Sequence, residues 1–410
     1  MEHAGKIDES ALTPGEKQAL PAASVDDLSW AVVKMRAGQR IVVNEALLAA
    51  YQAASSPHSI RALKSDLEAF DLWCRRMARI ALPATPETVA DYLDGRAGQG
   101  SKPASLGRYK ASIAKIHQLL DLKDPTSASL VKLRLQAIRR SLGTAQKQAR
   151  PLRFKGPVRN VEHDAPRGLN VRALLESCAE DLPGLRDRAL LSVGYDTGLR
   201  ASELVAIAVE HIVEAIDPEA RLLSIPRSKG DQEGEGATAY LSPRTVGALA
   251  AWLEAAGIEH GPVFRRVNVR RYKAKAAVRG RPIDSISGRE TWDLRKTLSK
   301  AAVPARIEYD VGEGALHPAS VGPIYRAMIQ RAFDRGALAD LTADDLVRLL
   351  KGVSAHSTRV GLNQDLFASG EDLAGIMDAL RWKSPRMPLA YNRNLAAEQG
   401  AAGRLMAKIG

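Results

Sequence analysis

Apolar residues recur at helical spacing through the first part of the chain. The strongest repeat begins at Ser59 and places seven apolar side chains on one stripe: Ile60, Leu63, Leu67, Phe70, Trp73, Cys74 and Met77. Thr85 followed by Pro86 is typical of a helix start. Further helices are expected at about residues 86–93, 105–120 and 129–142. Four helices joined by short loops predict a compact bundle.

The second half of the chain mixes helical repeats with two short runs of strand character. Arg221–Pro226 and Ala237–Leu241 flank the turn-rich SKGDQEGEG and indicate a hairpin. The expected helices are one capped by Asn170, then Gly184–Gly194, Pro243–Ala256, Pro318–Arg335 and Ala343–Lys351, the last with a Thr342–Asp345 capping box. The basic stretch 265–281 is expected to be loop. The predicted fold class is mainly α with a small β-sheet: an N-terminal helical bundle and a C-terminal α+β domain.

A length of 410 residues suits two domains, each able to bury its own core. Residues 1–40 are polar, Ala-rich and weakly patterned, so a disordered arm is expected there. The helical bundle is assigned to residues 41–150. Residues 151–168 carry prolines and basic groups and are expected to form a linker. The second domain is assigned to residues 169–410.

The cysteine content and the hydropathy bear on the cellular location. Cys74 and Cys178 form no CxxC or Cys/His cluster, which predicts buried free thiols in a reducing compartment and no structural zinc. No apolar run approaches the ~20 residues that a membrane span needs. The N-terminus also lacks the apolar core of a signal peptide. The sequence therefore predicts a cytoplasmic protein with no membrane partner.

The net charge of +12 is unevenly distributed. Residues 1–40 carry 5 basic and 6 acidic groups, residues 41–160 carry 20 and 9, and residues 161–410 carry 34 and 32. Nearly the whole excess therefore lies in the second block. One interpretation is a solvated basic face, and the other is a domain-sized surface for a nucleic-acid backbone. On the second interpretation, the expected DNA-binding residues are Arg108, Lys110, Lys115, Arg139, Arg140, Arg150, Arg153 and Lys155.

The stretch from Ala355 to Asn394 carries the first candidate chemistry. His356 and Arg359 are three residues apart, so on a helix they share a face and can reach one anion together. Ser354 is a plausible N-cap, and a helix start already favours negative charge. Trp382 and Tyr391 follow in a polar setting. Each residue alone also has an ordinary interpretation, such as a helix cap, a surface charge, a core aromatic or a packed phenol.

A second set of candidates lies upstream, in GYDTGLRASELVAI (residues 194–207). A turn at Gly198 is expected to place Arg200 at a helix start, where Glu203 can fix its guanidinium. Lys229 lies on the hairpin between the two predicted strands. That turn lacks the GKS or GKT of a phosphate-binding loop, which argues against nucleotide binding.

The chain carries, in this order, TGLRASEL, a hairpin Lys, HSTR, Trp382 and Tyr391. This order is similar to the signature of the tyrosine site-specific recombinases, the phage-integrase family. The resemblance implies that Tyr391 is the nucleophile and that Arg200 and Arg359 clamp the phosphate. It also implies roles for His356 as the motif histidine, Trp382 at the His/Trp position, Lys229 as general acid and Glu203 as a supporting acid. The bundle would then be a core-binding domain and the second domain the catalytic one.

The same resemblance implies partners and departures. The expected partners are double-stranded DNA with an inverted-repeat site and further copies of the chain, as a dimer on a site and a tetramer in a synapse. No cofactor and no metal are expected. Residues 395–409 are expected to form a helix that docks on a neighbouring copy. The chain departs from the family by about 40 extra N-terminal residues and an insertion within about 270–315.

Related chemistry leaves alternatives open. A type IB topoisomerase shares the same active-site groups but needs no tetramer. A telomere resolvase would fit the site as well, although no extra domain for it is recognisable. The non-enzyme alternative is a catalytically inactive DNA-binding protein, against which the complete residue set argues. An arm-binding integrase would need a folded module within residues 1–40.

Overall fold

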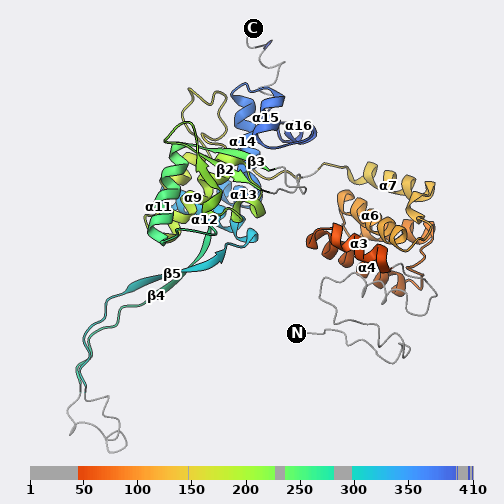
Figure 1. Ribbon diagram of the computed structural model, residues 1–410, viewed down its shortest axis with the longest axis horizontal. Helices are drawn as coiled ribbons and strands as arrows, with labels where there is room; N and C mark the ends of the chain where they lie inside the picture. The colour runs from red at the N-terminus through yellow and green to blue at the C-terminus, as the bar shows by residue number, and fades with distance from the viewer. Residues whose placement is uncertain are drawn as a thin grey trace, which may run out of the picture. The chain divides into compact units, whose positions relative to one another are not determined.

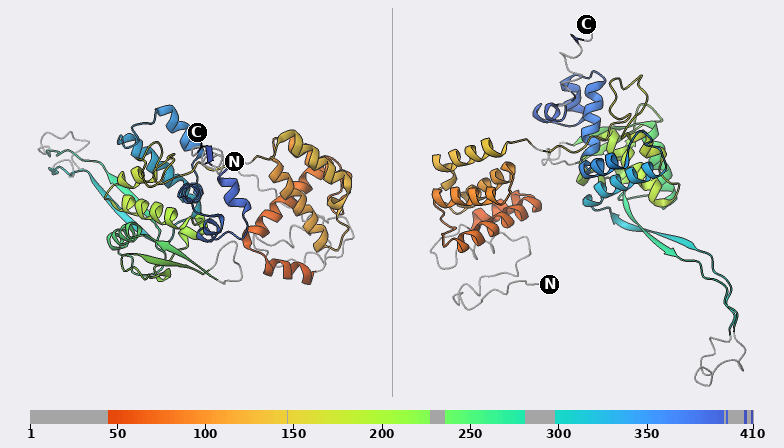
Figure 2. Two further views of the ribbon diagram at one scale, coloured as in Figure 1. Left: turned by 90° about the horizontal axis from the view of Figure 1, so that it is seen from above. Right: turned by 180° about the vertical axis from the view of Figure 1, so that it is seen from behind.

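The computed structural model describes residues 45–145, 147–226, 236–280 and 298–393, together with residues 395, 405, 406 and 409. The chain divides into two compact units, Met1–Gln146 and Lys147–Gly410. Figure 1 labels their helices and strands, and Figure 2 gives two further views. In the described part of the chain, no helix is long and apolar enough to cross a bilayer.

The first unit is a helical bundle whose helix starts follow from local capping. Its helices are α3 (Glu45–Ala54), α4 (Pro57–Arg76), α5 (Pro86–Gly98), α6 (Pro103–Leu119), the short 3-10 helix η2 (Pro125–Ser127) and α7 (Ser129–Leu142). Prolines occupy the first turn of α4, α5 and α6, where the helix needs no N–H from them. The Thr85 hydroxyl accepts a hydrogen bond from the Thr88 N–H at 3.3 Å. The four predicted helices are confirmed, and α3 precedes them.

The core of the first unit is built on the predicted apolar stripe. Phe70 and Tyr92 are both fully buried, and their rings meet edge to face at 4.9 Å. Cys74 is a buried free thiol, as Cys178 is in the second unit. Met77 was expected on the stripe, but its side chain is 56% exposed. Because α4 ends at Arg76, the helical period no longer carries Met77 to the core.

The second unit packs around helix α9 (Leu182–Thr197), most of whose side chains are buried. The other helices are α8 (Val171–Glu176), α10 (Ala201–Val205), η3 (Val209–His211), α11 (Pro243–Ala256), η6 (Pro318–Ser320), α12 (Val321–Asp334), α13 (Ala343–Gly352), α14 (Ser357–Ala368), α15 (Leu373–Ala379) and α16 (Arg386–Tyr391). Helices α11 and α14 both pack against α9. The helices predicted between Asn170 and Lys351 are confirmed, with small differences in their bounds.

A small antiparallel sheet lies beside these helices, with the strand order β1 (Ile212–Glu214), β2 (Arg221–Ile225) and β3 (Ala237–Leu241). Side chains of β2 and β3 alternate between the core and solvent, as in Leu241, which is buried, and Tyr240, which is 52% exposed. The two predicted strands are confirmed, and β1 is a further strand. The predicted fold class, mainly α with a small β-sheet, is confirmed.

Residues 265–281 were expected to be loop, and that prediction was wrong. Arg265–Tyr272 forms strand β4, which pairs with β5 (Arg306–Ala315) in an antiparallel two-stranded ribbon. Val267 and Val269 alternate with polar residues, which suits a strand. The many basic side chains hid this alternation, but they point into solvent and do not oppose strand pairing.

The chain around the start of the predicted linker packs against the end of α13 and the start of α14. Arg150 N–H donates to the Gly352 carbonyl at 2.9 Å, and Leu152 N–H donates to the Ser357 carbonyl at 2.9 Å. Leu152 is fully buried. A Cβ at Gly361 would lie 1.9 Å from the Leu152 carbonyl oxygen, so only glycine allows this close approach.

Candidate active site

Arg200 is held at the start of α10 by a local pair of contacts. The chain leaves α9 through Gly198, which has a left-handed φ of +56° and no room for a Cβ beside Leu380. Glu203 accepts a hydrogen bond from the Arg200 N–H at 3.0 Å and another from its guanidinium at 2.7 Å. The Glu203 side chain is 7% exposed and the Arg200 side chain 31%. The predicted contact between the two residues is therefore present, and part of the guanidinium faces solvent.

The segment before α14 differs slightly from the expected helix start. The helix begins at Ser357, and His356 rather than Ser354 precedes its first residue. The Ser354 hydroxyl instead accepts a hydrogen bond from the His356 N–H at 3.2 Å. A helix boundary of this kind shifts by one or two residues without changing which side chains share a face.

Arg359 points into the protein rather than along its surface. It is 1% exposed, and its guanidinium donates to the Gly198 carbonyl at 2.6 Å and also to the Leu380 carbonyl. Its central carbon lies 4.7 Å from the centroid of the Trp382 ring. Burial, together with the positive charges of Arg200 and Arg381, lowers the pKa of Arg359 to about 10, so the group is still charged at neutral pH. Two of its five N–H donors fix its orientation, which leaves others for an anion.

A short contact joins His356 to Tyr391. His356 Nε2 lies 2.5 Å from the Tyr391 hydroxyl oxygen, and the Tyr391 ring also packs against Trp382 at 5.6 Å. Burial, followed by the charges of Arg359 and Arg200, lowers the pKa of His356 to about 4. The imidazole is therefore neutral at pH 7, and in the tautomer with its hydrogen on Nδ1 its Nε2 accepts the hydrogen bond of the phenol. Burial also raises the pKa of Tyr391, an effect that Arg359 and Arg200 oppose.

The backbone of Tyr391 is held by amide side chains that the sequence interpretation missed. The Tyr391 carbonyl accepts hydrogen bonds from Gln364 at 2.9 Å and from Gln148 at 3.1 Å. The Asn363 amide donates to the Asn392 side-chain oxygen at 2.7 Å. Asn363 and Gln364 are buried polar residues one turn after Arg359, a signal that could have marked α14 as more than a core helix.

Arg153 was predicted to contact DNA, and the structure contradicts this. Arg153 is 4% exposed, and its guanidinium donates to the Asp365 carboxylate at 2.6 Å. The second Asp365 oxygen accepts from the Phe154 N–H at 2.7 Å and from the Tyr195 hydroxyl at 2.6 Å. Charge composition cannot reveal a partner more than two hundred residues away. In the sequence, the cation of this buried ion pair therefore resembled a surface cation. Arg153 fastens the linker segment to α14.

The other predicted DNA-binding residues lie at or near the surface. Lys110 and Arg139 border one hollow on α6 and α7, together with Lys132, and Arg140 is exposed. The side chains of three others donate hydrogen bonds to Asp66 (Arg108), Gln118 (Lys115) and the Glu162 carbonyl (Lys155), and the backbone N–H of Arg150 donates to the Gly352 carbonyl. A DNA role for these residues stays a prediction.

Two parts of the predicted site fall outside the described residues. Lys229 lies in residues 227–235, between the described strands β2 and β3. Most of the C-terminal segment that was expected to dock on a neighbour lies outside them as well. Of its apolar residues, Leu395 is half-buried, and Leu405, Met406 and Ile409 are more than half exposed.

Comparison with known proteins finds relatives among the recombinases, although no family model matches the sequence. The chain is 25% identical over 357 residues to the recombinase Cre of Escherichia phage P1, an alignment that covers 86% of this chain and 89% of Cre. The chain is similar to this tyrosine recombinase over most of its length. An integrase/recombinase XerD homolog of Selenomonas ruminantium is 29% identical over 225 residues, which cover 53% of this chain and only 61% of that relative. Both relatives are named as recombinases.

Two solved structures that align with most of this chain are DNA complexes. One is the XerH site-specific recombinase bound to palindromic difH substrate, with a TM-score of 0.46, 14% identity and coverage of 87% of this chain and 82% of that chain. The other is the Tn1549 transposon integrase in complex with transposon right end DNA, with a TM-score of 0.46, 11% identity and coverage of 80% and 88%.

Proposed function

We propose that this recombinase cuts and rejoins duplex DNA through a covalent 3′-phosphotyrosine on Tyr391. The observation that carries the proposal is the 2.5 Å contact between the Tyr391 hydroxyl and a neutral His356. Two guanidiniums, those of Arg200 and Arg359, are close enough to oppose the rise that burial causes in the pKa of this phenol. A phenol, a base and two cations together suit in-line attack on a phosphodiester.

In the first step, the Tyr391 oxygen attacks phosphorus while its proton passes to His356 Nε2. A phenol of pKa ~10 is a weak nucleophile at neutral pH until a base removes that proton. His356 can act as the base because burial keeps it neutral. The existing hydrogen bond already places donor and acceptor within transfer distance.

Negative charge then grows on the non-bridging phosphate oxygens. Arg200 and Arg359 would donate charge-assisted hydrogen bonds to these oxygens, with the Trp382 indole N–H as a further donor. Arg359 is oriented beforehand by two backbone carbonyls, so little reorganisation is needed at the moment of reaction. Glu203 holds Arg200 in place and is a positioning residue.

The leaving 5′-oxygen needs a proton, and the resemblance assigns its delivery to Lys229. The products are a 3′-phosphotyrosine and a free 5′-hydroxyl. The phosphotyrosine keeps the energy of the broken phosphodiester, so a 5′-hydroxyl from another duplex can attack it and release Tyr391. Strands are thus joined without ATP.

The assembly that we propose is a dimer on an inverted-repeat site and a tetramer when two sites are paired. Head-to-tail contacts of one surface with another close into a ring of this kind. The recombinase names of the relatives support strand exchange over relaxation by a type IB topoisomerase. A role for residues 395–409 in this contact, and a cytoplasmic location, stay predictions.

The proposal is tested by Tyr391→Phe on a library of nicked duplexes of random sequence. The nick lets the released strand diffuse away, so the covalent protein–DNA species accumulates and survives SDS. We expect an adduct with the wild-type protein, none with Tyr391→Phe, and an undiminished adduct with the control Tyr51→Phe. Sequencing the trapped DNA would give the target site. An adduct formed by Tyr391→Phe would overturn the assignment of the nucleophile.

A further inference from the structure

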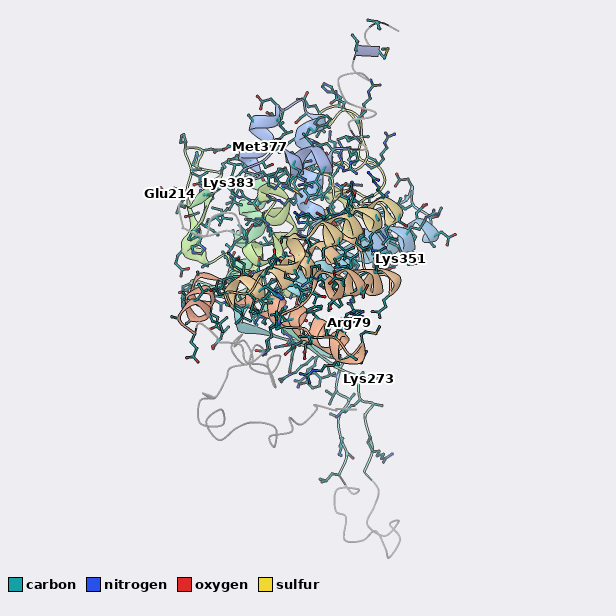
Figure 3. All side chains as sticks on the ribbon, turned by 90° about the vertical axis from the view of Figure 1, so that its right-hand side faces the viewer. Arg79, Glu214, Lys273, Lys351, Met377 and Lys383 are labelled. Atoms are coloured by element: carbon teal, nitrogen blue, oxygen red, sulfur yellow. The ribbon has the colours of Figure 1, made fainter. Side chains whose placement is uncertain are left out.

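The ribbon of β4 and β5 is longer than its two named strands. Two further pairings, Lys275 with Val303 and Val278 with Lys300, continue the same register beyond Tyr272. From Val267 to Val278 an extended strand covers roughly 35 Å. Figure 1 shows the ribbon projecting from the body of the second unit, and Lys273 lies on it in Figure 3.

The ribbon is firmly attached at its base. Val267 and Val311 pair across the strands and pack against the core of the second unit. The Tyr309 hydroxyl donates to Asp181 at 3.0 Å, at the start of α9. The Arg265 guanidinium donates to the carbonyls of Pro262 and His260 at 2.9 and 2.6 Å. These contacts fix the direction of the ribbon, whereas its outer part is exposed on both faces.

Positive charge is concentrated in the outer part of the ribbon. Its outer part, residues 270–280 and 298–308, contains one acid, Glu308, which pairs with Arg306 at 3.1 Å. Six further cations there are all exposed: Arg270, Arg271, Lys273, Lys275, Arg279 and Lys300. Asp310 and Glu313 lie nearer the base. Six like charges on a two-stranded ribbon repel one another, and nothing in the fold requires them, so they point to a polyanionic partner.

We propose that the outer part of this ribbon binds duplex DNA, in addition to the DNA held at the active site. A two-stranded ribbon fits the major groove of B-DNA, and the exposed cations would lie against its phosphates. The exposed Val303 and Ile307 could contact thymine methyl groups. The inference rests on the proposed function, because that function supplies DNA as the partner.

The test is the salt dependence of binding to a fluorescein-labelled duplex of mixed sequence several helical turns long. The test variant combines Arg271→Gln, Lys273→Gln, Lys275→Gln and Arg279→Gln. A matched control exchanges the same positions with retention of charge: Arg271→Lys, Lys273→Arg, Lys275→Arg and Arg279→Lys. Each lost phosphate contact reduces the magnitude of the negative slope of log K against log salt by ~0.9. We therefore expect the slope of the Gln variant to be smaller in magnitude than that of the wild type by about 2 to 4. The control should keep the wild-type slope.

The outcomes separate this inference from the proposed function. If the wild-type protein forms the covalent adduct but the Gln variant keeps the wild-type slope, the ribbon inference alone is wrong. If the wild-type protein neither binds duplex DNA nor forms the adduct, the proposed function fails and the inference fails with it. If the Gln variant unfolds at a lower temperature than the wild type, the double variant Lys273→Gln with Lys275→Gln provides the same test. Its slope should be smaller in magnitude than that of the wild type by about 1 to 2.

A second copy of the protein is the competing partner for this ribbon. It would use the apolar side chains rather than the cations. Loss of self-association in Val303→Thr with Ile307→Thr, measured by sedimentation, combined with an unchanged slope in the Gln variant, would identify a protein-binding surface and overturn the inference.

Discussion

Replacing Asp365 with alanine leaves a buried guanidinium without its charged partner. The side chains of Arg153 and Asp365 are 5% and 6% exposed, and the carboxylate accepts three hydrogen bonds. Breaking one partner of a buried pair typically costs 3–5 kcal/mol, so we expect Asp365→Ala to lose about 4 kcal/mol of unfolding free energy. At about 2–4 °C per kcal/mol for a unit of this size, the melting temperature should fall by roughly 8–16 °C.

The assay is thermal unfolding followed by circular dichroism, with Arg153→Leu, Asp365→Leu and the double variant as a cycle. The double variant removes both charges and should recover much of the stability lost by either single change. Arg153→Leu should also leave the salt slope of DNA binding unchanged, because Arg153 contacts no phosphate. A loss of unfolding free energy below about 1 kcal/mol in Asp365→Ala, the range typical of exposed pairs, would refute this reasoning. A salt slope of Arg153→Leu smaller in magnitude by ~0.9, the value of one phosphate contact, would also refute it.

Three further predictions concern the active site. Arg200→Ala should slow formation of the covalent adduct by about 10²–10³, since one donor to the developing charge is lost, while duplex affinity, measured by anisotropy, changes little. The His356 imidazole should titrate in an NMR experiment near the pKa of about 4. The unfolded chain takes up that proton near 6.5, so the folded state should lose stability as the pH falls from 6.5 towards 4, and a midpoint near 6.5 would contradict the buried geometry. Gln364→Ala should slow adduct formation without weakening binding, because it frees the Tyr391 carbonyl, and an equal loss in both assays would show that Gln364 is only structural.

Local signals explain why much of the fold could be predicted from the sequence. Helix α11 runs over the predicted residues, because Pro243 suits its first turn and Gly257 ends it in a left-handed conformation. Asn170 caps α8 through a 2.8 Å hydrogen bond from the Ala173 N–H. Information of this kind lies within a few residues along the chain.

Long-range contacts explain what the sequence did not reveal. Strand β4 depends on a partner some forty residues away, and its basic side chains hid the alternation. Arg153 differs from a surface cation only through Asp365, and Gln148 reaches Tyr391 from 243 residues away. No single-sequence pattern joins such pairs.

The residues of the candidate site could be predicted from the sequence, but their geometry could not. The order of Arg200, His356, Arg359, Trp382 and Tyr391 along the chain could be matched to a family. The inward direction of Arg359 and the 2.5 Å contact of His356 with Tyr391 depend on how α14, α15 and α16 pack. Their catalytic roles stay predictions.

Mass spectrometry of the trapped adduct tests the nucleophile most directly. After digestion with protease and nuclease, the nucleotide-bearing peptide should contain Tyr391, with the 3′-phosphate joined to its phenol oxygen. Removal of the nucleotide should require cleavage of a phosphotyrosine bond. A nucleotide attached to any other residue, or through a 5′-phosphate, would contradict the proposed reaction.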